Sequence, residues 1–366
     1  MPGFLVLETG EAFQGVWHGD SSLEFQRAGE VVFNTSHSGY EEIATDPSYF
    51  SQIVVMTAPM QGNYGVSRDV WESHRMWIEG FVCLQLQGGA GREQSWRDQL
   101  FEHQIPALSE VDTRALAVRL RSGGTPWGAL VSAENSTAAQ KIATTLIARQ
   151  KNKDKDWVHV ASRKEKMAFA GLQPKGPKIA VLDFGAKENI LRELKKRCSE
   201  IIVYPSRTSA EEIRRESPQG LMLTNGPGDP ADVQVAVSTV QALLGQLPIF
   251  GICMGHQILG LALGAKTYKL KFGHRGSNHP IRDELLKRVY MTSQNHGYAV
   301  DAKTLPADVK VTQVNLNDMT VAGFWSAQQN CLGIQYHPES HPGPHDAVGL
   351  FDYFVSQMIG TKGGRP

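Results

Sequence analysis

The chain has 366 residues, which is long for a single hydrophobic core and predicts two domains. Lys plus Arg and Asp plus Glu each number 37, so the net charge of zero indicates neither nucleic acid nor an anionic membrane as a partner. The four cysteines are scattered without a Cys-x-x-Cys pair, which argues against a disulfide framework and a zinc site. Because neither a signal-peptide pattern nor an apolar run of membrane length is found, we expect a soluble, cytoplasmic protein.

Strand signals dominate the first 150 residues. Short runs rich in Val, Phe and Leu predict strands over residues 4–7, 31–34, 53–58, 81–86 and 127–132. A helix is predicted over residues 112–121, because Asp112 or Thr113 can cap it and Gly123 and Gly124 end it. Residues 1–150 are therefore interpreted as a small α+β domain.

A charged, then Pro- and Gly-rich stretch follows a helix predicted over residues 137–149. Lysines and acidic residues alternate from Lys151, and Pro174-Lys175-Gly176-Pro177 ends the stretch. Such composition is typical of a solvated segment. We interpret residues 151–177 as the linker between the domains.

The pattern changes to repeated strand–helix units at Lys178. Strands are predicted over residues 179–184, 201–204, 221–224 and 249–252, with helices over 187–197, 210–216 and 232–244 between them. This alternation predicts an α/β domain over residues 178–366, with a mostly parallel, doubly wound sheet and a site at the carboxyl ends of its strands. Further strands are predicted over 289–292, 309–314, 321–325 and 332–336, and a closing helix over 351–359.

Cys253 lies at the junction of a predicted strand and a predicted helix. It is the centre of Gly251-Ile252-Cys253-Met254-Gly255, which resembles a nucleophile elbow with a thiol in place of the serine. Glycines allow the sharp turn that such an elbow needs, and the start of a helix favours a thiolate. The Met254 N–H would form half of an oxyanion hole. The alternative is a buried structural cysteine.

His337 is the best-placed base for Cys253. It follows a predicted strand, in His337-Pro338-Glu339, and Pro338 favours an extended chain before it. Residues two apart in an extended chain project to one side, so Glu339 can hold the imidazole. The alternatives are a structural histidine at this position and His256 as the base, although His256 is interpreted as a packing or capping residue.

A Gly- and Pro-rich loop, residues 225–230, ends the strand that precedes the Cys253 strand. The sequence Asn-Gly-Pro-Gly-Asp-Pro exposes backbone N–H groups in a loop that cannot become a helix. One glycine N–H could complete the oxyanion hole with that of Met254. The alternative is an ordinary turn.

These motifs together resemble the class I (triad) glutamine amidotransferases. The whole chain is similar to the small, glutamine-hydrolysing subunits of carbamoyl phosphate synthetase. The segments that carry this narrower resemblance are residues 39–49, 62–65, 111–114, 184–187, 271–276, 295–298 and 342–346. Departures from the usual family pattern are Tyr298, Ser277 and His341, and none of them removes a catalytic group.

The resemblance implies a role for each motif residue. Cys253 would be the nucleophile, His337 the base and Glu339 the residue that orients it. The glutamine site would be formed by Ser48 from the N-terminal domain and by Gly226, Gly228, Met254, Gln257, Asn295, Gly297 and Tyr298.

The activity that the resemblance implies is hydrolysis of L-glutamine to glutamate and ammonia through a cysteine thioester. Ammonia would pass to the large subunit of carbamoyl phosphate synthetase, which makes carbamoyl phosphate from bicarbonate and ATP for arginine and pyrimidine synthesis. Because the chain has no P-loop pattern, we expect no cofactor on it, with ATP and Mg on the large subunit. The alternatives are a glutaminase subunit of another synthetase and a regulatory subunit that hydrolyses nothing.

Overall fold

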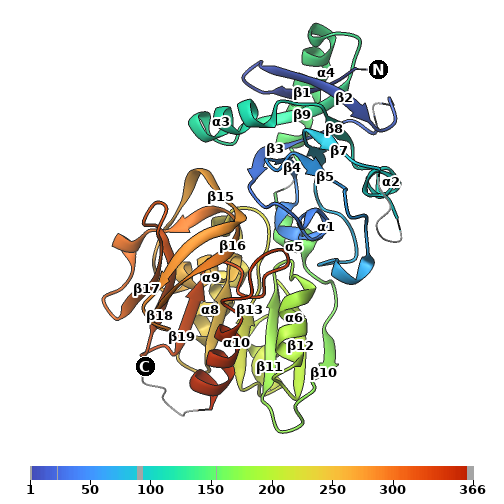
Figure 1. Cartoon of the computed structure of the whole chain (residues 1–366). Helices are drawn as coiled ribbons and strands as arrows, with labels where there is room; N and C mark the ends of the chain where they lie inside the picture. The colour runs from blue at the N-terminus through green and yellow to red at the C-terminus, as the bar shows by residue number, and fades with distance from the viewer. Residues whose placement is uncertain (1, 23, 89–93, 154, 361–366) are drawn as a thin grey trace. The chain divides into compact units, whose positions relative to one another are not determined.

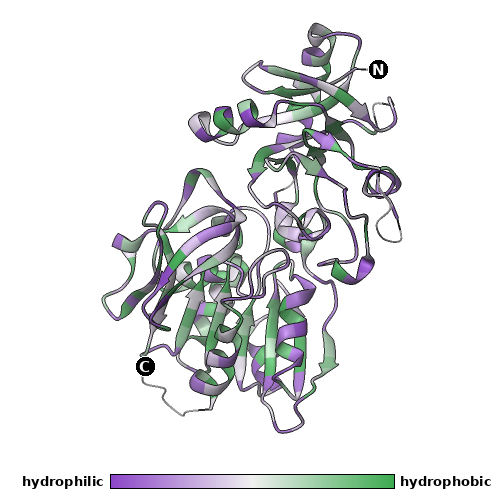
Figure 2. Ribbon diagram, viewed as in Figure 1, coloured by the Kyte–Doolittle hydropathy of each residue, from purple (hydrophilic) through white to green (hydrophobic). Residues whose placement is uncertain are grey.

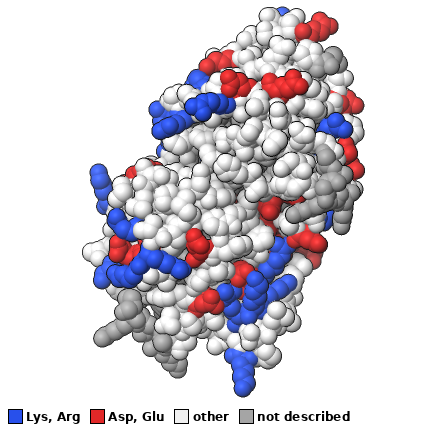
Figure 3. Space-filling view, viewed as in Figure 1, with Lys and Arg blue, Asp and Glu red and all other residues white. Residues whose placement is uncertain are grey.

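The chain divides into two compact units, residues 1–154 and 155–366. The computed structural model describes residues 2–22, 24–88, 94–153 and 155–360 (Figure 1). Within those ranges, no helix combines the length and the apolar character that crossing a membrane requires. Lys and Arg side chains lie among Asp and Glu side chains on the face seen in Figure 3, in keeping with the net charge of zero.

The first unit is built on a closed barrel of seven strands with the order β1-β2-β8-β6-β4-β3-β9. The pairs β3–β4, β4–β6 and β6–β8 are parallel. The other four pairs of the barrel are antiparallel. The barrel strands are β1 (Pro2–Leu7), β2 (Ala12–His18), β3 (Arg27–Asn34), β4 (Gln52–Met56), β6 (Gly80–Val82), β8 (Ala107–Ser109) and β9 (Trp127–Ser132). The single strand predicted over residues 81–86 is wrong, because β6 joins the barrel whereas β7 (Gln85–Leu86) pairs with β5 (Met60–Gln61).

Two amphipathic helices cover parts of this barrel. Leu116 and Leu120 of α3 (Thr113–Gly123) pack with the barrel interior, and Ala139 and Ala143 of α4 (Ser136–Lys151) pack on its outer face. The Asp112 carboxylate caps α3 by accepting a hydrogen bond from the Ala115 N–H, as expected from the sequence. The other helices of this unit are short: α1 (Tyr40–Thr45), η1 (Pro47–Tyr49), η2 (Arg68–Val70) and α2 (Trp96–Glu102).

The second unit contains a ten-stranded mixed sheet with the order β10-β12-β11-β13-β14-β19-β18-β17-β15-β16. Only the five strands from β12 to β19 are parallel to one another, so the prediction of a mostly parallel sheet holds for the centre alone. The antiparallel part exists because short connections join these later strands directly. The strands are β10 (Met167–Ala170), β11 (Lys178–Asp183), β12 (Glu200–Pro205), β13 (Gly220–Leu223), β14 (Ile249–Ile252), β15 (Thr267–Asp283), β16 (Arg288–Val300), β17 (Val309–Asn315), β18 (Val321–Ser326) and β19 (Cys331–Ile334).

Helices cover both faces of the parallel strands (Figure 1). Successive strand residues point to opposite faces, so Leu182 packs in the core beneath α8 and α9, and Val181 in the core beneath α6 and α10. The strand interiors are accordingly apolar along their whole length (Figure 2). The helices are α5 (Trp157–Ala161), α6 (Glu188–Lys195), α7 (Ala210–Arg215), η3 (Pro230–Asp232), α8 (Gln234–Leu243), α9 (Met254–Ala262), η4 (Ala302–Thr304), α10 (Gly349–Tyr353) and the π-helix η5 (Phe354–Ile359).

The stretch expected to be a solvated linker, residues 151–177, carries secondary structure. It forms α5 and then β10, which pairs with β12 as an edge strand of the sheet. Asp156 caps α5 by accepting a hydrogen bond from the His159 N–H, and Phe169 packs against the core of the second unit. All four residues of β10 are apolar, but a run of charged residues precedes them, which explains why composition alone suggested a linker.

Candidate active site

Cys253 occupies the turn between β14 and α9. Its backbone has φ of 54° and ψ of −103°, a conformation that few residues other than glycine adopt. Its N–H donates a 2.8 Å hydrogen bond to the Ile334 carbonyl on the neighbouring strand β19, which holds the strained residue at the sheet edge. The side chain is buried, with 2% of the residue exposed. A buried cysteine is therefore held in a strained turn at the N-terminus of a helix.

The two glycines that flank Cys253 are required by the close approach of backbone atoms. A Cβ atom on Gly251 would lie 2.5 Å from the Gly255 carbonyl oxygen, and a Cβ on Gly255 would lie 2.3 Å from the Leu223 carbonyl oxygen. Both distances are far below van der Waals contact. The Gly255 N–H also donates to the Thr224 carbonyl at 2.9 Å, which ties the turn to the end of β13. The Gly-x-Cys-x-Gly spacing thus has a packing reason at each end.

His337 and Glu339 lie just beyond the end of β19, the strand parallel and adjacent to β14. The His337 N–H donates to the Ser293 carbonyl at 2.9 Å, and the imidazole Nδ1 is 2.7 Å from Glu339 Oε1. An ionised carboxylate only accepts, so Nδ1 carries the proton and Nε2 is the nitrogen left for chemistry. The carboxyl ends of two neighbouring strands therefore bring Cys253 and the His337–Glu339 pair to the same edge.

The charges at this edge favour an imidazolium. Burial alone would lower the pKa of His337, but the Glu339 carboxylate and the Cys253 side chain together raise it above its ordinary value. Burial would raise the pKa of Glu339, yet Lys187 and His337 lower it to about 2. Glu339 is consequently ionised at any physiological pH and stabilises a proton on His337.

Lys187 is a candidate site residue that the sequence reasoning missed. Its ammonium lies 3.1 Å from Glu339 Oε1, and the side chains of Lys187 and Glu339 are 2% and 0% exposed. The same ammonium donates to the Ser340 carbonyl. Glu339 thus accepts from a histidine and a lysine at one oxygen, and the buried carboxylate has two cationic partners.

The end of β11 holds Lys187 in place. The Asp183 carboxylate accepts hydrogen bonds from the Gly185 and Ala186 N–H groups at 2.9 and 2.8 Å, which forms a tight turn. Asn225 Oδ1 accepts from the Lys187 N–H at 3.0 Å. The sequence did contain a signal for this site, since residues 184–187 are among the segments that carry the family resemblance. A single lysine after a predicted strand, however, is usually solvent-exposed, so it was not selected as a site residue.

The 225–230 loop packs against the residue that follows β11. Phe184 N–H donates to Thr224 Oγ1 at 2.9 Å. A Cβ on Gly226 would lie 2.4 Å from the Phe184 carbonyl oxygen, so only glycine fits there. Gly228 has φ of +90°, a left-handed conformation that favours glycine. The loop that the sequence selected follows β13, which lies between β11 and β14, so it is at the same sheet edge as Cys253.

The segment 295–298, which lies on β16, contacts Cys253 and the helix α9 directly. Cys253 Sγ is 3.5 Å from the Asn295 carbonyl oxygen, and Gln257 Nε2 donates to the Tyr298 carbonyl at 2.8 Å. The His296 Nδ1–H donates to that same carbonyl at 2.7 Å. One connected region around Cys253 therefore contains several of the predicted glutamine ligands of the second unit, namely Met254, Gln257, Asn295 and Tyr298. Gly297 lies between the last two, in the 295–298 segment.

Two family models match the chain, one in each unit. The model described as Carbamoyl-phosphate synthase small chain, CPSase domain, matches residues 5–130, and the one described as Glutamine amidotransferase class-I matches residues 180–357. A carbamoyl phosphate synthase small chain from Symbiobacterium thermophilum is 45% identical over 361 residues, which cover 96% of this chain and 97% of the relative. The chain belongs to the carbamoyl phosphate synthase small chain family.

Other members of the small chain family match over nearly their whole length. The small chain from Listeria monocytogenes is 43% identical over 368 residues and covers 99% of this chain and 98% of its own. The small chain from Methanopyrus kandleri is 43% identical over 364 residues, with 97% and 99% covered. The match therefore includes both units, and a class I amidotransferase domain alone would not give it.

Two further residues have clear surroundings in this small chain. His256, on α9, is fully buried with its ring 4.6 Å from that of Phe324, and burial lowers its pKa to about 3. This environment agrees with a packing role. Ser48 lies in η1 of the first unit, where its N–H donates to Asp46 Oδ1 at 2.9 Å, and its assignment to the glutamine site stays a prediction. Among the described residues, no group of three or more His, Cys, Asp or Glu side chains is arranged to hold a metal ion.

Proposed function

We propose that this chain is the glutamine-hydrolysing subunit of a carbamoyl phosphate synthase. The observation that carries the proposal is the strained Cys253 at the N-terminus of α9, next to the strand whose end presents His337 and Glu339. A thiol, an imidazole and a carboxylate in this order are the groups that nucleophilic attack on an amide requires.

The reaction begins with attack of the Cys253 thiolate on the carboxamide carbon of glutamine. The C–N bond breaks as His337 delivers its proton to the leaving nitrogen, which departs as ammonia and leaves a glutamyl thioester. His337 then takes a proton from water, whose oxygen attacks the thioester and releases glutamate. Glu339 remains ionised throughout, because its pKa of about 2 lies far below working pH.

The turn at Cys253 acts in this proposal as a nucleophile elbow with an oxyanion hole beside it. The Met254 N–H, at the first position of α9, would donate to the developing oxyanion, and a glycine N–H of the 225–230 loop would be the second donor. Gly226 and Gly228 are the candidates, since Pro227 has no N–H. Close packing of Gly226 on Phe184 fixes that loop before substrate arrives.

Ammonia would be consumed by the large chain of the same synthase. We place ATP and Mg on that partner and no cofactor on this chain, and the carbamoyl phosphate would supply arginine and pyrimidine synthesis. The names of the relatives, which are all small chains, support a partner of this kind. A glutaminase without a coupled synthase would waste glutamine, so the isolated chain is expected to be slow and to be activated by the partner.

The test is to measure glutamate release and carbamoyl phosphate formation with the purified chain, alone and with a carbamoyl phosphate synthase large chain. We expect slow glutamate release alone, and a strong rise together with carbamoyl phosphate formation when the large chain, ATP and bicarbonate are added. Glutamate without carbamoyl phosphate would point to another synthetase. A lack of glutamate under all conditions would leave only a regulatory subunit.

A further inference from the structure

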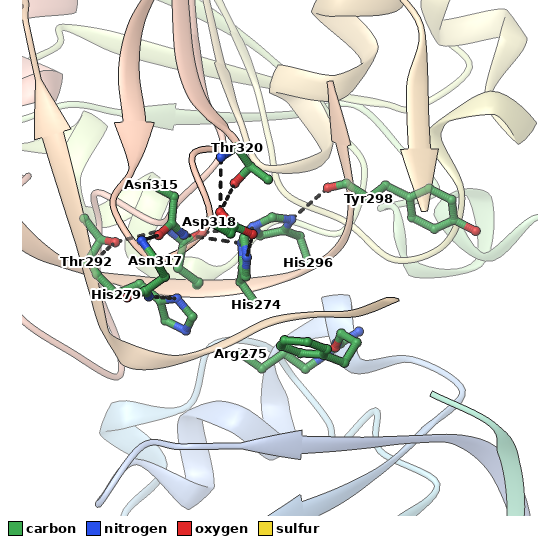
Figure 4. Close-up of polar contacts among 12 residues, drawn as sticks. His274, Arg275, His279, Thr292, His296, Tyr298, Asn315, Asn317, Asp318 and Thr320 are labelled. Carbon is green, nitrogen blue, oxygen red and sulfur yellow. Dashed lines mark hydrogen bonds and ion pairs between the residues drawn. The ribbon is translucent and has the colours of Figure 1, made fainter. Parts of the chain in front are cut away.

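A buried histidine pair joins His296 of the 295–298 segment to His274, and it takes no part in the steps above (Figure 4). His274 on β15 is the pairing partner of His296 on β16, and both side chains are buried. Asp318, in the turn after β17, reaches back to His274 with its carboxylate. A third histidine, His279, lies with its ring 5.2 Å from that of His274.

The contacts of the two rings fix the number of protons that they carry. His296 Nδ1 lies 2.7 Å from the Tyr298 carbonyl, and His274 Nε2 lies 2.7 Å from Asp318 Oδ2, so both of these nitrogens are donors. The remaining nitrogens, His274 Nδ1 and His296 Nε2, are 3.1 Å apart. His296 Nε2 also lies 3.0 Å from the acceptor Gln294 Oε1, and the donor Asn315 Nδ2 lies 3.4 Å from His274 Nδ1. These partners place a proton on His296 Nε2, between the two rings. Two neutral imidazoles carry two protons, whereas these contacts need three.

The surroundings of the pair include a third histidine, an arginine and one carboxylate. Burial lowers the pKa of His296, and the charges of His274 and Arg275 lower it further. Burial and the charge of His274 also lower the pKa of His279 to about 4, so this ring stays neutral. Although partial burial would raise the pKa of Asp318, its hydrogen bond to His274 lowers it to about 2. The Asp318 carboxylate is therefore ionised where it faces His274.

We propose that His274 and Asp318 are positioning residues for glutamine, which act on the 295–298 segment through the hydrogen-bonded His274–His296 pair. The pair fixes the plane and tautomer of the His296 ring, because each of its nitrogens has a set partner. His296 in turn holds the Tyr298 carbonyl together with Gln257. The inference rests on the proposed function, since it assigns this segment to glutamine binding.

Asp318→Asn is the decisive variant. In the wild type, Asp318 Oδ1 accepts hydrogen bonds from the Thr320 N–H and hydroxyl. The amide oxygen of an asparagine can accept the same two hydrogen bonds, so the turn is preserved. It removes the negative charge and can present an NH₂ group to His274. The third ring proton of the His274–His296 pair then has no carboxylate to balance its charge. Glu284→Gln, which removes an exposed carboxylate just beyond β15, is the matched control, and Asp318→Glu tests rescue by a carboxylate.

The first measurement counts ring protons by ¹⁵N NMR of the histidine-labelled chain without glutamine, at about pH 7. We expect three protonated ring nitrogens in the His274–His296 pair of the wild type and of Glu284→Gln, and two in Asp318→Asn. Two protonated nitrogens in the wild type would overturn the shared proton. This result does not depend on any glutaminase activity.

The second measurement follows the 295–298 segment and the kinetics. Backbone hydrogen exchange at Gly297 and Tyr298 should become faster in Asp318→Asn, and the KM for glutamine should rise about 3- to 10-fold with kcat little changed. Asp318→Glu should recover part of the loss. Unchanged exchange in Asp318→Asn would overturn the positioning role even if the chain hydrolysed no glutamine, whereas altered exchange without hydrolysis would contradict the proposed function alone.

Discussion

The ammonium of Lys187 and the carboxylate of Glu339 form a buried ion pair with an N–O distance of 3.1 Å. Glu339 shares the same oxygen with His337 at 2.7 Å, so one carboxylate orients the imidazole while a lysine balances its charge. Taking a carboxylate out of water is costly unless it is paired and hydrogen-bonded. Lys187 therefore makes it possible for Glu339 to be both fully buried and ionised.

Replacing Lys187 by Met should destabilise the second unit by about 3–5 kcal/mol, because Glu339 would keep its burial and lose a cationic partner. Urea unfolding of the purified chain measures this loss. Lys166→Met is the control, since Lys166 contacts Glu216 at 2.7 Å but is half exposed, and it should cost less than about 1 kcal/mol. Adding Glu339→Gln to Lys187→Met should recover part of the stability. Equal losses for the two lysines would show that the buried pair is not special.

Acid should weaken the wild type more than Glu339→Gln. The pKa of Glu339 is lowered from 4.5 to about 2 in the folded chain, so its contribution to stability is complete above the unfolded value. That contribution is lost as the pH falls through the range between the two values. The free energy of unfolding, followed from about pH 6 to about pH 3, should fall more steeply in the wild type. Parallel curves for the two proteins would contradict the lowered pKa.

Gly255→Ala should unfold the elbow or abolish glutamate release, since the added Cβ would meet the Leu223 carbonyl oxygen at 2.3 Å. Gly349→Ala is the matched control, because a Cβ there meets nothing within 4 Å. In that helical position alanine should be neutral or stabilise by up to about 1 kcal/mol. Thermal unfolding and glutamate release of both variants give the comparison. Normal activity in Gly255→Ala would mean that the turn differs from the one described.

His337→Asn should reduce glutaminase kcat more than Glu339→Gln does. His337 transfers protons in both half-reactions, and loss of a general base costs roughly 10²–10⁴ in rate. Glu339→Gln leaves an amide oxygen that can accept from Nδ1, so orientation is partly kept. Steady-state glutamate release in the assembled enzyme measures both. A larger loss at Glu339 would give the carboxylate a direct part in proton transfer.

The central strands could be predicted because their residues are apolar on both faces. The predicted strand over residues 127–132 has the same bounds as β9, and the strand and helix that flank Cys253 follow the change of period at that residue. Strand β15 could not be found this way. Its first half is largely exposed and polar, and its pairing with β16 comes from contacts distant in sequence.

The candidate site was predicted where local pattern and chemistry coincide. Cys253 has flanking glycines, and His337 has a carboxylate two residues on, so a short stretch of sequence carries each signal. Lys187 and Asp318 have no such signal, because each acts on a residue far away in the chain. A lysine is expected to be solvent-exposed from sequence alone, and only the tertiary structure shows that Lys187 is buried with Glu339 as its partner.

The most direct test of a Cys253 nucleophile is Cys253→Ala in the complex with a carbamoyl phosphate synthase large chain, assayed with glutamine and then with ammonium. Because nucleophile and synthesis would belong to different chains, the glutamine-dependent rate should fall at least about 10²-fold. The ammonium-dependent rate should stay at the wild-type value. Glutamine use at even about a tenth of the wild-type rate would contradict the assignment of Cys253.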